Sequence, residues 1–221
     1  MKKHFKILFS LFVLLFVVAM TVHGIQEPGI AMVAFALPIG FGPLKWACGS
    51  ENMGGYKNRL LFIPSCSVSA IPELPDEIAA SEDLVTASGA FTFTEVGDKP
   101  IFIYATDKTV SLNAENQGDQ DGQSFKQTGE FFHPGSKAEV AAFARKVNNT
   151  PGYLILEDAN GDQFMVGSKG LPANIKPSFA GGGERTDRKG FQFTFEADSF
   201  APFVILGAPI DIDEIENPVI P

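Results

Sequence analysis

The sequence predicts a mainly β protein: a β-sandwich or barrel with one flanking α-helix, plus an N-terminal hydrophobic segment. About eight short segments alternate apolar with polar residues or form brief apolar runs, as strands do. One segment, 136–148, instead has the i, i+3, i+4, i+7 spacing of an amphipathic helix. Phenylalanine occurs 21 times in 221 residues, which is enough for a large aromatic core. Many strands and one helix favour a sandwich or barrel.

Residues 1–45 differ in composition from the rest of the chain. Three lysines precede an apolar run at 7–20, the pattern of a secretory signal peptide. A second apolar run, 30–44, is broken by two prolines, and the two runs together also fit a membrane anchor. A start assigned too far upstream explains the same change in composition at Lys45. Signal peptide, anchor and misassigned start therefore remain three alternatives for residues 1–45.

We expect one domain at 46–208, followed by an acidic tail at 209–221. The first strand is Arg59–Ile63, and Pro64 ends it. Two prolines in Ile71–Ala80 exclude a regular central strand, so that segment is expected to be an extended arm or loop. Three further strands then follow at 90–95, 100–105 and 109–112. A polar loop is expected at 116–122.

The helix follows a strand at 124–132 and a Pro-Gly turn. Ser136 is expected to be the N-cap, and Glu139 completes a capping box with it. The apolar stripe of the helix, which is expected to face the core, consists of Val140, Phe143, Ala144 and Val147. The helix is expected to end at Asn148-Asn149.

A hairpin comes next, with strands at 152–157 and 163–166. Asn160-Gly161 between them predicts a two-residue type I′ turn. Residues 170–178 carry two prolines and are expected to form an edge strand. A flexible glycine-rich loop then leads into a strand at 189–197, where three phenylalanines alternate with polar residues, and 202–206 closes the domain.

The charge balance argues against a nucleic-acid-binding module. The chain has 17 Lys and Arg against 26 Asp and Glu, a net charge of −9. Residues 1–45 contribute +3, so residues 46–221 carry −12. Such an acidic domain repels phosphate, although it could surround DNA without gripping it.

No residues are nominated as catalytic, cofactor-binding or metal-binding, and we do not expect an enzyme. His133 lacks the partners of a hydrolytic site and is read as a turn histidine. The aspartates at 119–121 and 158–162 resemble fragments of calcium loops but lack the twelve-position ligand set. The glycine-rich stretch 180–185 has no following GK[ST] motif. The alternating phenylalanines, which could in principle stack bases, are assigned to the core.

Cys48 and Cys66 have no metal-ligand spacing. A disulfide between them and a pair of free thiols therefore remain two alternatives.

Four stretches resemble a group of phage and prophage structural proteins of the Bacteroidetes, similar in plan to the tail tube proteins of long-tailed phages. These stretches are GSENMGGYKNRLLFIP, DGQSFKQTGEFFHPGS, FARKVNNTPGYLILED and DRKGFQFTFEADS. The resemblance covers roughly residues 47–207. It implies a virion tail protein without enzymatic activity, assembled in the host cytoplasm as six-subunit rings that stack into a hollow tube.

In that plan the partners are other copies of the chain and other tail proteins, and DNA is only cargo in the lumen. Sheet edges join neighbouring subunits, and the elements expected to bridge successive rings are 71–81, 113–122 and 180–189. The N-terminal apolar segment departs from this plan. A genuine leader would instead favour a secreted or membrane-anchored β-sandwich binding module at the cell surface. A head-tail connector or decoration protein is a further alternative.

Overall fold

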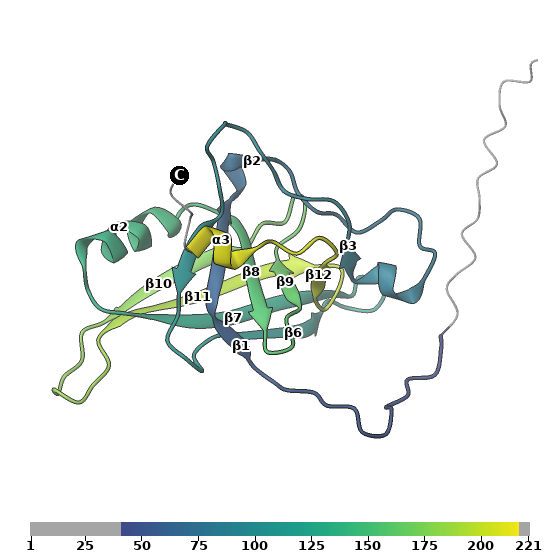
Figure 1. The fold of residues 1–221 in the computed structure, drawn as a ribbon, viewed down its shortest axis with the longest axis horizontal. Helices are drawn as coiled ribbons and strands as arrows, with labels where there is room; N and C mark the ends of the chain where they lie inside the picture. Colours follow the sequence, from purple (N-terminus) through teal and green to yellow (C-terminus); the bar gives the residue numbers. More distant parts are fainter. Residues whose placement is uncertain (1–40, 217–221) are drawn as a thin grey trace, which may run out of the picture. The chain divides into compact units, whose positions relative to one another are not determined.

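The computed structural model describes residues 41–216, so the predicted leader lies almost wholly outside the described residues. A six-stranded sheet has the order β3-β12-β9-β8-β1-β5 (Figure 1). Its strands are β1 (Tyr56–Pro64), β3 (Thr86–Ala87), β5 (Ile101–Tyr104), β8 (Gly152–Asp158), β9 (Gln163–Val166) and β12 (Val204–Leu206). All neighbours are antiparallel except β12 and β3, which are parallel.

The second sheet has four antiparallel strands in the order β10-β11-β7-β6. They are β6 (Ser111–Gln117), β7 (Ser124–Pro134), β10 (Asn174–Ala180) and β11 (Gly190–Ser199). A small sheet pairs β2 (Val68–Ala70) with β4 (Thr92–Phe93). The helical elements are η1 (Ser65–Ser67), η2 (Ser81–Leu84), α2 (Ala138–Val147) and α3 (Ile212–Glu216). The predicted fold class, mainly β with a flanking helix, is confirmed.

The first core lies between the two sheets and α2. Alternate residues of β1 and β8, such as Leu60 and Leu156, face Phe131 and Phe193 of the four-stranded sheet. The Phe131 and Phe193 rings stack at 4.9 Å between centroids. Alternation along the strands thus places one apolar face of each sheet in this core.

The second core covers the opposite face of the six-stranded sheet. Leu61, Ile63 and Ile155 fill it from the sheet, and the residues that pack over them come from two irregular segments, 68–93 and 201–215. Both faces of β1 and β8 are therefore buried. This explains why the sequence has continuous apolar runs there rather than alternation.

Helix α2 has the predicted stripe but a different start. Ala144 and Val147 are buried, and Val140 and Phe143 are half-buried. The predicted capping box is wrong: Lys137, not Ser136, is the N-cap, and no side-chain hydrogen bond caps the helix. The N–H of Gly135 donates to the Lys189 carbonyl at 2.9 Å. That bond extends the pairing of β7 with β11 past the strand and delays the helix.

The β8–β9 hairpin is confirmed, but its two-residue type I′ turn is wrong. Gly161 has a φ of +100°, whereas Asn160 is not in the left-handed region that type I′ requires. The Asp158 carboxylate accepts hydrogen bonds from the N–H groups of Asn160, Gly161 and Asp162 at 2.8–2.9 Å. This side chain stabilises a longer, three-residue connection ending in Gly161.

Three strand predictions differ from the structure in extent. Only Thr92–Phe93 of the expected strand 90–95 is a strand, because the neighbour that it pairs with, β2, is only three residues long. Strand β6 continues to Gln117, through much of the predicted loop. Strand β10 is an edge strand, as predicted, but runs from Asn174 to Ala180.

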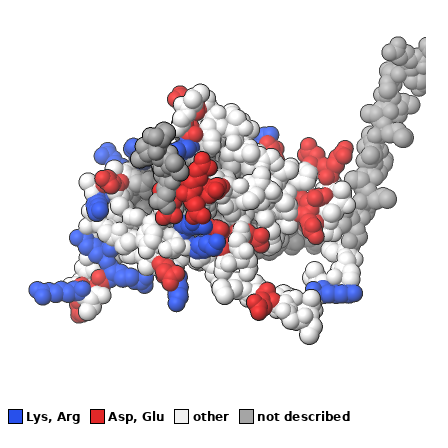
Figure 2. Space-filling model, in the orientation of Figure 1, with Lys and Arg blue, Asp and Glu red and all other residues white. Residues whose placement is uncertain are grey.

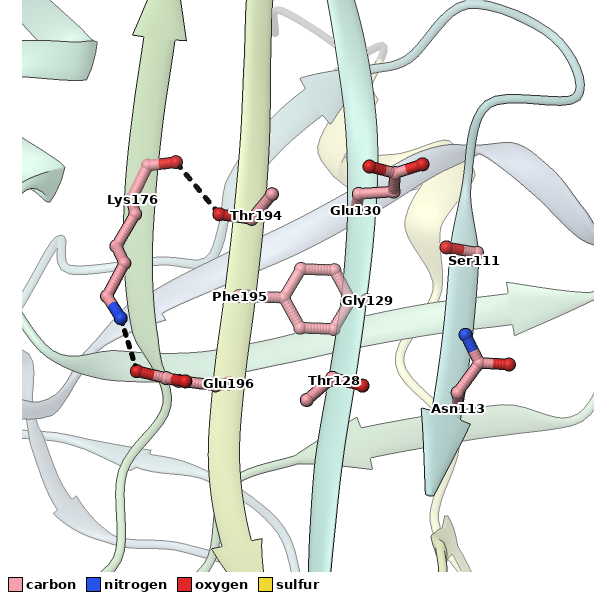
Figure 3. A pocket seen from close by; sticks show the side chains of 9 residues that line it. All are labelled: Ser111, Asn113, Thr128, Gly129, Glu130, Lys176, Thr194, Phe195 and Glu196. Carbon is pink, nitrogen blue, oxygen red and sulfur yellow. Dashed lines mark hydrogen bonds and ion pairs between the residues drawn. The ribbon is translucent and has the colours of Figure 1, made fainter. Parts of the chain in front are cut away.

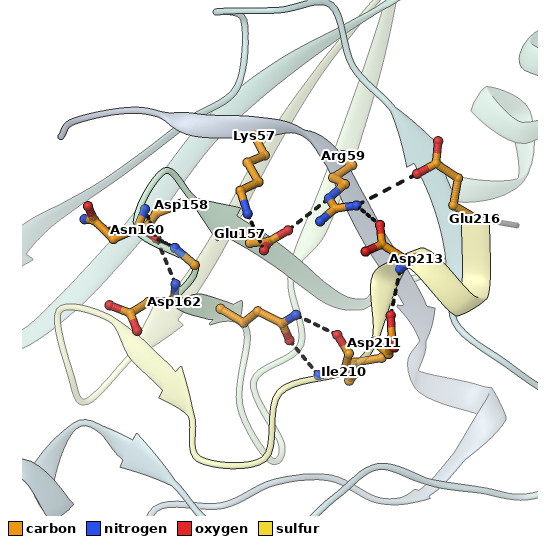
Figure 4. A network of polar contacts seen from close by, with 12 residues as sticks. Lys57, Arg59, Glu157, Asp158, Asn160, Asp162, Ile210, Asp211, Asp213 and Glu216 are labelled. Atoms are coloured by element: carbon orange, nitrogen blue, oxygen red, sulfur yellow. Dashed lines mark hydrogen bonds and ion pairs between the residues drawn. The ribbon is translucent and has the colours of Figure 1, made fainter.

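The described part of the predicted acidic tail, 209–216, packs on the domain. Ile212 is buried, and Ile210 and Ile215 contact the second core. The Gln163 side chain donates to the Ile210 carbonyl at 2.7 Å and accepts from its N–H at 2.8 Å. Arg59 pairs with Glu157 at 3.0 Å and also with Asp213 of α3 (Figure 4).

Replacing Gln163 by leucine is expected to release residues 208–216 from the sheet. The substitution leaves the half-buried Ile210 N–H and C=O without their partner, at a cost of about 1–3 kcal/mol. Hydrogen exchange of the segment 208–216 measures the effect. The control Gln123→Leu changes an exposed loop glutamine and should leave this exchange unchanged. Equal protection of 208–216 in the two variants would contradict the prediction.

Candidate assembly surface

Apart from Phe132, which pairs with Gln192, the outer face of the four-stranded sheet is polar. Positions next to the buried Phe193, Phe131 and Ile175 point away from the core, because side chains alternate along strands. These outward positions carry small polar or charged residues: Ser111, Asn113, Glu115, Lys126, Thr128, Glu130, Lys176, Ser178, Gln192, Thr194, Glu196 and Asp198. A sheet face of this composition is adapted to water rather than to a further core layer.

A short ion-pair chain crosses this face. Glu196 of β11 accepts from Lys176 of β10 at 2.5 Å and from Lys126 of β7 at 3.0 Å. Lys176 and Glu196 line a shallow hollow of about 340 Å³ that spans all four strands (Figure 3). The hydrogen bond from Lys176, and then that from Lys126, lowers the pKa of Glu196 below its ordinary 4.5. The hollow is open and shallow, so it does not enclose a ligand.

The Glu196 carboxyl is therefore expected to titrate below pH 4.5 in the folded protein. Any stability from these pairs is present above the unfolded pKa and is lost as the pH falls through the lowered folded pKa. Replacing Lys176 by methionine should move the Glu196 midpoint up towards 4.5. Carboxyl-carbon NMR measures the Glu196 midpoint in the unchanged chain and in Lys176→Met. The control is Lys57→Met, which removes a partner of Glu157 and should leave the Glu196 midpoint where it is. An unchanged midpoint in Lys176→Met would contradict the assignment.

Within residues 41–216, both edges of the four-stranded sheet are open, that is, without a further strand paired to them. Strands β10 and β6 each have one neighbour in the sheet. An edge strand presents unpaired N–H and C=O groups that another chain can pair with. Pro177 interrupts the donors of β10, whereas β6 runs for seven residues without a proline.

The structure places the three segments expected to bridge rings in different environments. Glu73, in the segment 71–81, exchanges backbone hydrogen bonds with Ser88 at 3.1 and 2.8 Å, so the segment's first part is tied to its own domain. Its later part, from Asp76 to Ser81, is exposed almost throughout. The segment 113–122 is divided, because 113–117 belong to β6 and only 118–122 form a loop.

The segment 180–189 is the exposed connection between β10 and β11. The Asp187 carboxylate accepts from the N–H groups of Gly183 at 2.7 Å and Glu184 at 2.8 Å. The bonds from Glu184 and then Gly183 lower the pKa of Asp187. The Arg188 guanidinium lies 5.5 Å from the centre of the Phe132 ring. The loop thus has a defined local geometry despite its glycines.

Opposite charges gather in different regions of the surface. Figure 2 shows Lys and Arg gathered where the β10–β11 loop projects, and Asp and Glu gathered over α3 and beside β3. The residues 71–81 contain three acids and no base, whereas 180–189 contain three bases and two acids. Two of the expected bridging segments therefore differ in sign.

The residues considered for chemistry occupy structural positions. The His133 ring nitrogen Nδ1 lies 2.8 Å from the Tyr104 carbonyl, which fixes the ring at the sheet edge. The Asp158 carboxylate is engaged in its turn, and Asp121 is a loop residue with a φ of +70°. Phe193 and Phe195 are buried, so their assignment to the core is confirmed. Within 41–216 there is no group of three or more His, Cys, Asp or Glu residues placed to hold a metal ion.

Both cysteines are free and exposed in the structure. Of the two alternatives for this pair, the structure has the free thiols.

An apolar segment before β1 was missed by the sequence analysis, because composition grouped most of it with the leader. Phe41, Leu44 and Trp46 are all exposed. The available signal was an aromatic and aliphatic cluster at 41–46, beyond the first apolar run.

No helix in the described part of the chain is both long and apolar enough to cross a membrane. Comparisons of this chain with protein-family models, with curated proteins and with solved structures found no match.

Proposed function

We propose that the chain is a non-enzymatic structural subunit that assembles with copies of itself into rings, stacked as the tail tube of a phage or prophage. One observation carries the proposal: the four-stranded sheet has a polar outer face and two open edges. The resemblance of four sequence stretches to phage structural proteins supports the same reading.

Edge pairing between copies leads naturally to a ring. The two open edges, β10 and β6, are different surfaces, so pairing one with the other is a head-to-tail contact. Head-to-tail contacts close into rings when the rotation between copies allows it. Closure also removes the exposed edges, as in any β-barrel. The polar faces of the sheets would then line a water-filled lumen.

The charges on this face suit passage of DNA without binding. Four carboxylates point outward on β6, β7 and β11, against the two lysines Lys126 and Lys176. Glu196 pairs with both lysines, and the four carboxylates together leave this face with a net charge of −2. An acidic lumen has no electrostatic attraction for the DNA backbone.

Stacking of rings has a candidate contact in the oppositely charged segments. The acidic segment 71–81 of one copy and the basic loop 180–189 of another attract each other over the range of a Debye length, about 8 Å at physiological salt. Such complementarity contributes mainly to the orientation and rate of association.

Electron microscopy of the purified full chain, from dilute to concentrated solution, tests the proposal. Hollow rings or tubes are expected as the concentration rises. The double variant Ala114→Lys and Asn116→Lys adds charge at exposed positions of the β6 edge and should abolish them. Ala142→Lys, at an exposed position of α2, is the matched control and should leave them intact. A chain that stays monomeric at every concentration would contradict the proposal.

A further inference from the structure

An apolar groove lies between the edge strand β5 and helix α2. Its volume is about 320 Å³, near the lower end of the 300–1,000 Å³ typical of binding pockets. Ile101 and Tyr104 contribute from the strand, and Val140 and Phe143 from the helix. Ile101 and Tyr104 are 39% and 43% exposed, which leaves the groove open to solvent. Glu139 is the one carboxylate among its lining residues.

The segment 41–55, here called the arm, has the complementary character. Every residue of the arm is exposed, including Phe41, Leu44 and Trp46. Within the described residues the arm joins the domain at its last residue, where the Ala159 N–H donates to the Gly55 carbonyl at 3.2 Å. A cluster of exposed large apolar side chains of this kind marks a contact surface.

We propose that the arm of one copy docks in the β5–α2 groove of a second copy. In an extended chain Leu44 and Trp46 point to the same side, so both can enter one groove. Lys45 lies between them and points to the rim, where Glu139 supplies the opposite charge. β5 ends its sheet, so the arm's backbone can pair along the same edge as an added strand.

A second copy fits the observations better than the chain's own arm. In the single chain the arm is wholly exposed and the groove is open, so neither apolar surface is covered by another part of the same molecule. In Figure 1 the arm, which precedes β1, lies on the side of β1 that is away from α2. The inference rests on the proposed self-assembly and names the contact that would strengthen it.

The fluorescence of Trp46, the one tryptophan of the chain, tests the contact directly. In the full chain its emission is expected to shift to shorter wavelength as concentration rises, because the indole enters an apolar groove. Ile101→Glu should remove the shift, whereas Leu84→Glu, an exposed apolar position outside the groove, should retain it. A shift that is absent, or that does not depend on concentration, would overturn docking in a second copy.

Cross-linking provides a second measurement that does not depend on assembly size. Cys48 lies two residues beyond Trp46 and is exposed. In a Cys66→Ser background, Glu139→Cys is expected to form disulfide-linked dimers through Cys48 under oxidised glutathione. Ala141→Cys places a thiol about 200° away around the helix, given 100° per residue, and should give at least tenfold less dimer. Equal cross-linking from the two positions would overturn the inference.

Electron microscopy of the same samples separates this inference from the proposed function. Rings that form without the fluorescence shift or the Glu139→Cys cross-link would overturn the arm contact alone. Cross-linked pairs that never form rings would support the arm contact and overturn the tube.

Discussion

Replacing Phe193 by alanine is expected to lower the free energy of unfolding by about 3–5 kcal/mol. The Phe193 side chain is 1% exposed, and its ring stacks on Phe131 at 4.9 Å between centroids. It also meets the edge of Phe143 from α2 at 5.9 Å. One ring therefore contacts the four-stranded sheet and the helix within the first core, so its removal leaves a cavity that neither element can readily fill.

Urea unfolding followed by circular dichroism measures the change, provided that the assembly is kept dissociated by dilution. Phe200→Ala is the matched control, because Phe200 is 82% exposed. Its effect should stay within about 0.5 kcal/mol, as for most surface positions. If the two variants lose the same stability, Phe193 does not have the role in the core assigned to it here.

Local sequence patterns predicted the strands that have one face in the core and the other face in solvent. The alternation of Phe191, Phe193 and Phe195 with polar residues gave both the strand and its buried face, as observed in β11. The amphipathic stripe of α2 was equally readable. In these segments local propensity and tertiary burial agree, which is the condition under which sequence patterns are reliable.

The second core could not be predicted from local sequence patterns. It is covered by irregular segments whose partners are far along the chain, such as Phe93 and Ile215. In this cover Phe91 and Phe93 face the core and Thr92 is exposed, as in a strand, but only Thr92–Phe93 finds a neighbour to pair with, the short strand β2. The alternation at 90–95 was therefore mistaken for a longer strand. Nothing local indicated that Gln163 would bond to the backbone of Ile210, 47 residues later.

The candidate assembly surface was predictable in part. Alternation alone predicts polar outward positions such as Thr194 and Glu196 on β11. Which strands form the sheet edges depends on long-range pairing. The prolines of the segment 170–178, of which Pro177 lies in β10, predicted that edge, whereas nothing in the sequence identified β6 as the other edge. The β5–α2 groove brings together Ile101 and Val140, residues that no sequence motif connects.

Replacing Gly129 by alanine is expected to cost about 3 kcal/mol or more, at or beyond the upper end of the range for overpacking. A Cβ atom at Gly129 would lie 2.1 Å from the Ser111 carbonyl oxygen and 2.3 Å from Cζ of Phe195. Phe195 is paired directly with Gly129 across the strands, and its ring covers the glycine. Relief of the clash requires β6 to move away from β7, which breaks the pairing at the edge proposed to join subunits.

Thermal unfolding and ring formation, measured on the same samples, separate the two consequences. Gly122→Ala is the matched control, because the added Cβ would meet nothing closer than 3.8 Å, and it should be neutral or slightly stabilising. Adding Phe195→Ala to Gly129→Ala removes the ring but leaves the contact with the Ser111 carbonyl. The double variant should therefore fail to recover the stability of Phe195→Ala alone. Full recovery would mean that the ring, and not the β6 backbone, is what requires glycine at this position.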